Sequence, residues 1–364
     1  MAAYELARAG VETVLIDEKL AWEKPCGGGV TFKAYEQYPF VKDAPHRPVA
    51  HSIITTENAG GVALDLNKPL LIFARKDLNQ LLLDRASRAG ARIEKARVTE
   101  ARPGGAWSLA TSAGGKIEAD FVVVATGARN PLRSLGTQFH PGDTMTALGY
   151  YTPGARPDID IQFFPGFEGY IWNFPRCDHA SVGICGKRES AHAMRARLEA
   201  YMESNGIPRG QFYAHVLPSL ETPSWRENRV AGNGWLAVGD SAGLVDPVTG
   251  EGIYYAMRSG ELAGSLIAQG QVHQYKQSID EEFADDLAYA STLAHRVFTG
   301  RYFFSANTRR LIQFLRHSPR LRGIVQELFA GTLPYVELRR RIKSTLHATL
   351  AEIAVNGFLR RVVQ

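Results

Sequence analysis

The sequence has few cysteines and no apolar run long enough to cross a membrane. Its 364 residues include three cysteines, Cys26, Cys177 and Cys185, too few and too odd in number for a disulfide framework and without metal-ligand spacing. No run of about 18 apolar residues occurs, and no basic segment followed by an apolar core opens the chain. These absences argue against secretion, membrane insertion and metal binding, and we expect a protein of the reducing cytoplasm.

The start of the chain lacks the first half of a dinucleotide-binding βαβ unit. Residues 2–9 are predicted to form a helix and residues 11–16 a strand that ends at Asp17-Glu18, which corresponds to the second half of such a unit. The opening strand and its G-x-G-x-x-G loop, parts of a unit of roughly 30 residues, do not precede them. We therefore expect an N-terminally shortened version of a complete enzyme. A divergent protein that has given up tight cofactor binding is the alternative.

The most informative segment that is present covers residues 235–263. An apolar strand runs into Gly239-Asp240, and a glycine-rich loop then opens a helix near Gly252 and Ile253. The Asp240 carboxylate can accept a hydrogen bond from a ribityl hydroxyl, and the helix N-terminus favours the negative charge of a reduced flavin. The pattern predicts a flavin site, although an ordinary strand–loop–helix connection also fits. Glycines let a backbone approach a flat ring, and they stand here at Gly239, Gly243, Gly250 and Gly252.

Four blocks follow one another along the chain. They are Pro25-Cys26-Gly27-Gly28-Gly29, the Val-Val-Val-Ala-Thr-Gly run of residues 122–127, Tyr170-x-Trp172-x-Phe174-Pro175 followed by Gly183, and the Gly239-Asp240 loop. In this order they resemble the geranylgeranyl reductase family, FAD-dependent enzymes built like p-hydroxybenzoate hydroxylase.

The resemblance implies an α/β fold. We expect a Rossmann-like FAD-binding domain of the p-hydroxybenzoate hydroxylase type, an inserted α+β substrate domain with an antiparallel sheet, and a C-terminal helical region. The discontinuous FAD-binding domain is expected at residues 1–45, 72–135 and 228–273. The substrate domain is expected at residues 46–71 and 136–227, and the helical region at residues 274–364.

Further residues are expected around the FAD. Asp17, at a strand end, suits the adenosine ribose hydroxyls, and Glu18 competes for this role. The resemblance places Arg75 at the FAD, where its fork of donors suits a pyrophosphate, and the main chain of Val98 at the adenine. Gly127 ends the Ala-Thr-Gly turn. For Asp17 and Arg75 the alternative is an ordinary charged residue at the surface.

Cys26 is the candidate for the chemistry. The resemblance places its loop, with Gly28 and Gly29, beside the isoalloxazine ring, where a polarisable thiol can touch the flavin or an alkene that is being reduced. The thiol could donate a proton to the substrate, or it could only shape the pocket. Both roles remain open.

The third block predicts an aromatic wall, which we define as Tyr170, Trp172 and Phe174. These side chains fall on one face of a strand by its period of two, and a flat apolar wall suits an isoprenoid chain. The alternative is that the three rings form a domain core. The resemblance extends the substrate site to Pro175 and Gly183. Where the family has Gly-x-Gly, this sequence has Gly183-Ile184-Cys185, which puts the identity of the substrate in doubt.

The C-terminal part of the chain is basic. Residues 296–364 contain thirteen Arg or Lys and three acids, so they account for more than the net charge of +5. Apolar residues at helical spacing stand among these charges and predict basic amphipathic helices that settle on an anionic membrane surface. A solvated helical cap is the alternative, and no motif accompanies the charge to indicate nucleic-acid binding. The apolar residues are Leu311, Ile312, Phe314, Leu315, Leu346, Leu350 and Ile353.

These interpretations together favour an FAD-dependent reductase that saturates C=C double bonds of a polyprenyl substrate. We expect a prenylated lipid as substrate, no metal and no nucleic acid, and a location in the cytoplasm or at the inner face of a membrane. The electron donor cannot be named, because no second glycine loop for NAD(P)H is evident. Alternatives are a flavin-dependent monooxygenase or halogenase of the same fold, or a non-catalytic lipid-binding remnant of a flavoenzyme.

Overall fold

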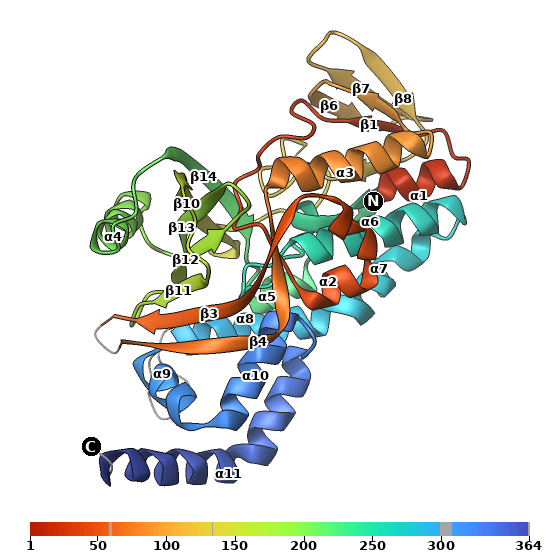
Figure 1. Cartoon of the computed structure of the whole chain (residues 1–364). Coiled ribbons are helices and arrows are strands. Elements are labelled where there is room, and N and C mark those ends of the chain that lie inside the picture. The colour runs from red at the N-terminus through yellow and green to blue at the C-terminus, as the bar shows by residue number, and fades with distance from the viewer. Residues whose placement is uncertain (58–59, 133, 299–307, 363–364) are drawn as a thin grey trace. The chain divides into compact units, whose positions relative to one another are not determined.

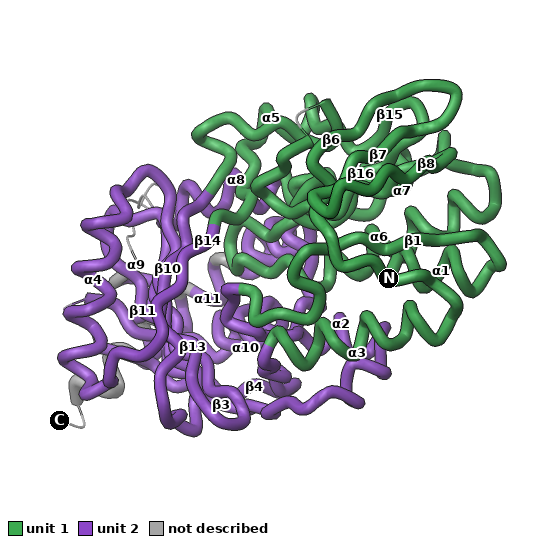
Figure 2. The backbone as a smooth tube through the Cα atoms, turned by 90° about the horizontal axis from the view of Figure 1, so that it is seen from above, with its two compact units in different colours: residues 1–24, 75–144, 216–288 green, residues 25–74, 145–215, 289–364 purple. Residues whose placement is uncertain are grey.

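The structure is a computed structural model that describes residues 1–57, 60–132, 134–298 and 308–362. The chain forms two compact units, each built from three segments (Figure 2). Unit 1 comprises residues 1–24, 75–144 and 216–288, and unit 2 comprises residues 25–74, 145–215 and 289–364. These boundaries differ from the expected ones. Residues 25–45, expected in the FAD-binding domain, belong to unit 2, and the expected C-terminal region is divided at residue 288.

Unit 1 contains two pairs of short parallel strands. β1 (Val14–Ile16) pairs in parallel with β5 (Arg92–Glu94), and β9 (Val122–Val124) pairs in parallel with β16 (Trp235–Ala237). β15 (Ala231–Gly232) lies antiparallel to β16. The apolar runs of β9 and β16 are typical of buried parallel strands. The two parallel pairs belong to separate sheets.

A three-stranded antiparallel sheet completes the strands described in unit 1. It consists of β6 (Val98–Arg102), β7 (Trp107–Thr111) and β8 (Lys116–Ala119). Residues 116–124 do not form one continuous strand. β8 ends at Ala119, and β9 starts a different sheet after Asp120, where the main-chain N–H of Val122 donates to the carbonyl of Gly234. Residues 92–102 are likewise divided between β5 and β6.

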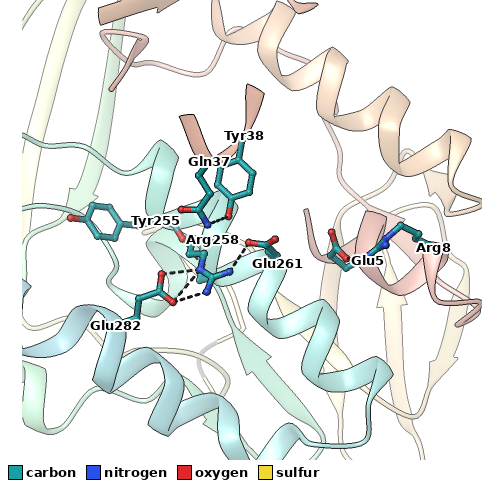
Figure 3. A network of polar contacts seen from close by, with 9 residues as sticks. Glu5, Arg8, Gln37, Tyr38, Tyr255, Arg258, Glu261 and Glu282 are labelled. Atoms are coloured by element: carbon teal, nitrogen blue, oxygen red, sulfur yellow. Dashed lines mark hydrogen bonds and ion pairs between the residues drawn. The ribbon is translucent and has the colours of Figure 1, made fainter. Parts of the chain in front are cut away.

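Helix α6 (Ile253–Ala268), which begins at the predicted flavin loop, is firmly held within unit 1. Its Gly264 lies so close to α1 (Ala2–Arg8) that a Cβ would come within 2.7 Å of the Cβ of Glu5. On its other side Arg258 donates to Glu282 at 2.8 Å and to Glu261 at 2.8 Å (Figure 3). Hydrogen bonding to Glu282 raises the pKa of Arg258. These contacts anchor the middle and the second half of α6 within unit 1.

Unit 1 contains further helices and turns. The longest helix among them before residue 253 begins at Arg75. The elements are α3 (Arg75–Arg88), η2 (Pro141–Asp143), α5 (Thr222–Arg226), η3 (Gly239–Ala242), η4 (Val272–Gln274), α7 (Tyr275–Ile279) and η5 (Asp280–Ala284), and α8 (Asp285–Phe298) continues into unit 2.

Unit 2 is built on an eight-stranded sheet in the order β14-β10-β13-β12-β11-β3-β4-β2. Four of its strands lie between residues 144 and 186, where apolar and polar residues alternate as in a sheet with two different faces. The strands are β2 (Gly29–Val30), β3 (His46–Thr56), β4 (Gly60–Phe73), β10 (Thr144–Pro153), β11 (Ile159–Phe163), β12 (Gly169–Pro175), β13 (His179–Gly186) and β14 (Gln211–Pro218).

Helices pack on this sheet in two places. α4 (Ala191–Ser204) covers one face, where its Met194 and Leu198 pack with Ile171 and Ile184. At the long β3–β4 hairpin, α9 (Thr308–His317) and α10 (Pro319–Ala330) lie against the strands (Figure 1). The other helical elements of unit 2 are α2 (Phe32–Gln37), η1 (Pro39–Asp43) and α11 (Tyr335–Val362). Among the residues described, no helix is long and apolar enough to span a bilayer.

Candidate functional site

The predicted flavin loop places Asp240 at the start of α6. β16 runs into Gly239, whose φ of +55° suits glycine, and η3 carries Asp240. A Cβ on Gly252, the residue before α6, would lie 3.4 Å from Oδ1 of Asp240. The N-cap residue of α6 is Gly252 itself, which has no side chain to cap the first turn. The Asp240 carboxylate and the first turn of α6 therefore lie side by side, while Gly250, at a φ of +72°, makes the turn before them.

Lys24 is a member of this site that sequence reasoning missed. Its Nζ lies 3.0 Å from Oδ2 of Asp240, and the two side chains are 25% and 13% exposed. Partial burial weakens solvent screening, so this ion pair is stronger than one at an open surface. Its position directly before the Cys26 loop, which we define as residues 25–29, was the available signal.

Arg75 lies at the start of α3. Both carboxylate oxygens of Glu23 cap this helix, accepting from the main-chain N–H groups of Arg75 at 2.9 Å and Lys76 at 3.1 Å. The Arg75 guanidinium donates from Nη2 to Asn79 at 3.3 Å, while its buried Nε has no hydrogen-bond partner in the described residues. A buried donor of this kind fits an anionic acceptor supplied by a cofactor.

The structure separates the roles of Asp17 and Glu18. Oδ1 of Asp17 accepts from the main-chain N–H groups of Lys19 at 2.7 Å and Leu20 at 2.5 Å, which fixes the turn after β1. Glu18 instead forms an ion pair with Arg97 at 2.6 Å, directly before Val98. Because Arg97 occupies Glu18, Asp17 is the better candidate for a ribose.

No neighbouring residue crowds the position that a side chain would take at Gly127. Its φ is +79°, and a Cβ there would meet no atom within 4 Å. Glycine is required at this position by the backbone conformation and not by packing.

In unit 2 the Cys26 loop packs on the aromatic wall. A Cβ on Gly27 would lie 2.8 Å from the ring of Phe174, and one on Gly29 would lie 3.2 Å from it. Gly28, at a φ of +89°, lies so close to β4 that a Cβ would come within 2.1 Å of the Phe73 carbonyl oxygen. The three glycines therefore allow close approach to a ring and to a strand, and they bring the first and third blocks together.

The register of β12 and β13 explains how the aromatic wall is accommodated. Tyr170, Trp172 and Phe174 pair with small residues of the next strand, which are Cys185, Gly183 and Ser181 in that order. A Cβ on Gly183 would lie 2.3 Å from the indole ring of Trp172. Large side chains on one strand thus lie over small ones on its neighbour.

The aromatic wall is not flat, and its members differ in burial. The rings of Tyr170 and Trp172 meet at 66° with their centroids 6.3 Å apart. Trp172 is 6% exposed and belongs to the core, which was the alternative reading of this residue, whereas Tyr170 and Phe174 are half-buried. Pro175, which ends β12, is buried. Tyr170 and Phe174 are therefore the rings available to a ligand.

Cys185, the departure from the glycine pattern, fills space beside Tyr170. It is buried, its Sγ lies 3.9 Å from the Tyr170 carbonyl oxygen, and burial raises the pKa of its thiol to about 12. The thiol is neutral near pH 7 and acts as an apolar group there.

Sequence reasoning also missed Arg176 and Ser181, two buried residues whose side chains contact the main chain of Cys26. Neither belongs to a recognisable motif, although Arg176 directly follows the third block. Both contacts lie within unit 2.

In the basic C-terminal helices, much of the apolar surface and charge is taken up by contacts with other residues of the protein. Ile312 and Leu315 of α9 are buried against Ile54 and Leu64 of the β3–β4 hairpin, so the expectation that α9 offers this face to a membrane is wrong. Ion pairs join Arg320 to Glu352 and Arg341 to Glu327. The side chains of Leu346, Leu350 and Ile353 lie outside the described part of the chain. In that part no cluster of His, Cys, Asp or Glu could hold a metal ion.

A search of protein-family profiles gave no match. The chain is 31% identical over 314 residues to geranylgeranyl diphosphate reductase of Oryza sativa subsp. japonica, which covers 75% of this chain and 64% of that protein. It is 28% identical over 296 residues to digeranylgeranylglycerophospholipid reductase 2 of Methanothermobacter thermautotrophicus, covering 74% of each. The chain thus spans a little under two thirds of the length of the rice relative.

Solved structures show the same fold. A geranylgeranyl bacteriochlorophyll reductase-like protein of Thermoplasma acidophilum superposes with a TM-score of 0.75 at 18% identity, over 94% of this chain and 95% of that one. A flavin-dependent brominase gives a TM-score of 0.70 at 16% identity, over 91% and 90%. The fold is that of p-hydroxybenzoate hydroxylase-like flavoenzymes. By sequence the chain is similar to the geranylgeranyl reductases, and its fold is that of the flavoenzymes to which it is compared.

Proposed function

We propose that this protein is an FAD-dependent reductase that saturates C=C double bonds of a geranylgeranyl-type polyprenyl chain. The observation that carries the proposal is the packing of the Cys26 loop on Phe174, with Gly27 and Gly29 against the ring. It joins a thiol to an apolar aromatic surface within one unit. The names of the rice and archaeal relatives support a geranylgeranyl-type substrate.

The residues of unit 1 suit FAD. When bound, FAD in its reduced form supplies the hydride for one alkene carbon, and a proton completes the other. The N-terminus of α6 would favour negative charge on the flavin, and Asp240 would accept from a ribityl hydroxyl. Arg75 has a buried Nε available for the pyrophosphate, and Asp17 stands at a strand end for the ribose. The external electron donor remains to be identified.

The residues of unit 2 suit an alkene in an apolar chain. Tyr170 and Phe174 are half-buried, and Ile161 and Phe329 pack in the same cluster as Phe174. Such a surface offers apolar area without demanding hydrogen bonds, as an isoprenoid requires. Cys26 would donate the proton or shape this surface. Cys26→Ser separates the two roles, because the hydroxyl keeps the size of the thiol but not its acidity.

The decisive experiment is mass spectrometry of the products. Dithionite-reduced, FAD-loaded protein is incubated with a geranylgeranylated lipid, and Asp240→Ala protein serves as the cofactor-deficient control. A mass gain in steps of two hydrogens supports the proposal. A gain of oxygen or halogen would instead identify a monooxygenase or halogenase, and an unchanged lipid would leave a binding protein on a flavoenzyme scaffold.

We also propose that contact with an anionic membrane surface, if the substrate is a bilayer lipid, falls to α11. Arg339 and Lys343 are exposed on this helix. Such charges bind anionic lipid, and salt screens the attraction. Cosedimentation with phosphatidylglycerol vesicles at low salt, weakened in the Arg339→Gln/Lys343→Gln double variant, is the expected result. Equal sedimentation of both proteins would contradict it.

A further inference from the structure

We propose that Arg176 and Ser181 are positioning residues that clamp the main chain of Cys26 and so fix the location of its thiol. The catalytic purpose of the clamp rests on the proposed function, whereas the clamp itself is a feature of unit 2. The Cys26 carbonyl oxygen accepts from Nη2 of Arg176 at 2.7 Å and from Oγ of Ser181 at 2.9 Å. Two donors, one of them charged, hold one peptide group.

Arg176 is itself held rigidly. Its side chain is fully buried, its Nη1 lies 3.2 Å from Nε2 of His179, and its guanidinium lies 5.0 Å from the centre of the Tyr151 ring. Its main-chain N–H also donates to the carbonyl of His179 at 2.8 Å. A planar group fixed by its neighbours gives up little conformational entropy when it binds the Cys26 carbonyl.

The direction of the Ser181 hydrogen bond follows from its neighbours. Nε1 of Trp172 donates to the Ser181 oxygen at 3.3 Å, and the Tyr213 hydroxyl lies 2.8 Å from the same oxygen. Burial raises the pKa of Tyr213, so its phenol remains protonated and can donate. A serine hydroxyl has two lone pairs and one proton. With Trp172 and Tyr213 as donors, the Ser181 proton is directed to Cys26.

Gly28 links the position of the Cys26 carbonyl to that of the Cys26 thiol. The main-chain N–H of Gly28 lies 3.3 Å from Sγ of Cys26. Gly28 is in turn fixed to β4, because its carbonyl accepts from the N–H of Phe73 at 2.9 Å. The thiol thus lies between a clamped carbonyl and a strand-bound N–H group. If the clamp is lost, we expect the main chain at Cys26 to become more mobile, while Gly28 stays bound to β4.

The test measures thiol reactivity in flavin-free protein, where no turnover is needed. In a Cys177→Ser background, which removes the exposed thiol, iodoacetamide labelling of Cys26 is followed by mass spectrometry, with buried Cys185 as internal reference. Ser181→Ala and Arg176→Lys should each speed the labelling of Cys26 by about five- to tenfold, the effect of losing one hydrogen bond. Ser181→Thr, which keeps the hydroxyl, should restore most of the parent rate.

Two variants serve as matched controls. Ser52→Ala removes another fully buried serine hydroxyl of the same unit, and Arg197→Lys removes another guanidinium that lies on aromatic rings. Neither residue contacts Cys26 in the described structure, so both variants should label at the parent rate. Thermal melting of every variant checks that the fold is retained.

Turnover of FAD-loaded protein gives the second readout. Ser181→Ala should lower kcat with KM and FAD content nearly unchanged, because substrate and flavin contacts remain. Labelling of both clamp variants within twofold of the parent would overturn the inference, whatever their activity. Faster labelling in a protein that reduces no alkene would leave the clamp standing and reject the proposed function.

Discussion

Nζ of Lys24 lies 3.0 Å from Oδ2 of Asp240, a contact between residues 216 positions apart in the chain. Both side chains are largely buried, and Asp240 lies beside Gly252 at the start of α6. The carboxylate expected to hold the ribityl chain is therefore oriented by a cation before any ligand arrives. Two variants separate the contributions of the two charges.

Asp240→Ala is expected to weaken FAD binding ten- to a hundredfold. A charge-assisted hydrogen bond to the ribityl chain is lost, which costs on the order of 1.5–3 kcal/mol. Fluorescence titration with FAD measures the effect. Asp65→Ala, which removes an exposed carboxylate in unit 2, is the control. Identical titrations of the Asp240 variant and the parent would show that this loop does not hold the cofactor.

Lys24→Met is expected to make the midpoint potential of bound FAD more negative, on the order of 30 mV. A nearby cation favours the anionic reduced flavin, so its removal disfavours reduction. Spectroelectrochemical titration measures the shift. Lys76→Met removes an exposed lysine of the same unit and should leave the potential unchanged. A Lys24 variant with the parent potential would place the ammonium group away from the redox-active ring.

Gly183→Ala is expected to destabilise unit 2 by about 1–3 kcal/mol, the usual result of overpacking. The new methyl group would lie 2.3 Å from the Trp172 ring, and the neighbouring strand leaves the ring little freedom to move. Urea unfolding measures the loss. Gly323→Ala, on α10 with no atom within 4 Å of its Cβ position, is the control and should be neutral or stabilising. Equal stabilities would mean that the strands separate readily here.

Tyr170→Ala and Trp172→Ala are expected to act on different quantities. Trp172 is buried, so its truncation should cost about 3–5 kcal/mol of unfolding free energy. Tyr170 is half-buried, and its loss should mainly raise KM for the lipid, roughly tenfold. Urea unfolding and steady-state kinetics on both variants decide between these outcomes. A stable Trp172 variant with impaired substrate binding would reverse the assignment.

Cys185 is expected to make the unfolding free energy fall at alkaline pH. Burial raises the pKa of its thiol from 9.0 to about 12, so above pH 9.0 the unfolded chain loses a proton that the folded protein keeps. Stability should then decline by about 1.4 kcal/mol per pH unit, and Cys185→Ala should remove this part of the decline. Urea unfolding of parent and variant at about pH 8 and about pH 10 measures the difference. Parallel declines would argue against a neutral buried thiol.

Local features of the site could be predicted from the sequence. Contacts between residues far apart in the chain could not. The Asp240 loop and strands β10–β13 follow from glycine placement and alternation, which are local patterns. Lys24, Glu23 and Arg176 were missed because their partners lie 216, 52 and 150 residues away. No spacing rule connects positions so distant.

Helix α9 shows a second kind of limit. Its apolar residues were correctly identified as one face, but Ile312 and Leu315 pack on the β3–β4 hairpin and not on lipid. Periodicity predicts that a face is covered, and it does not predict what covers it.

The pairing of Trp172 with Gly183 has a consequence for how the sheet aligns. A slip of one residue between β12 and β13 would place the indole against Val182 or Ile184, where a branched side chain occupies the space. The volume of one ring and the missing Cβ of its partner thus select the alignment during folding. The same alignment sets Ser181 opposite Phe174, within reach of the Cys26 carbonyl. An error in strand pairing would therefore misplace the thiol even if every residue of the site were intact.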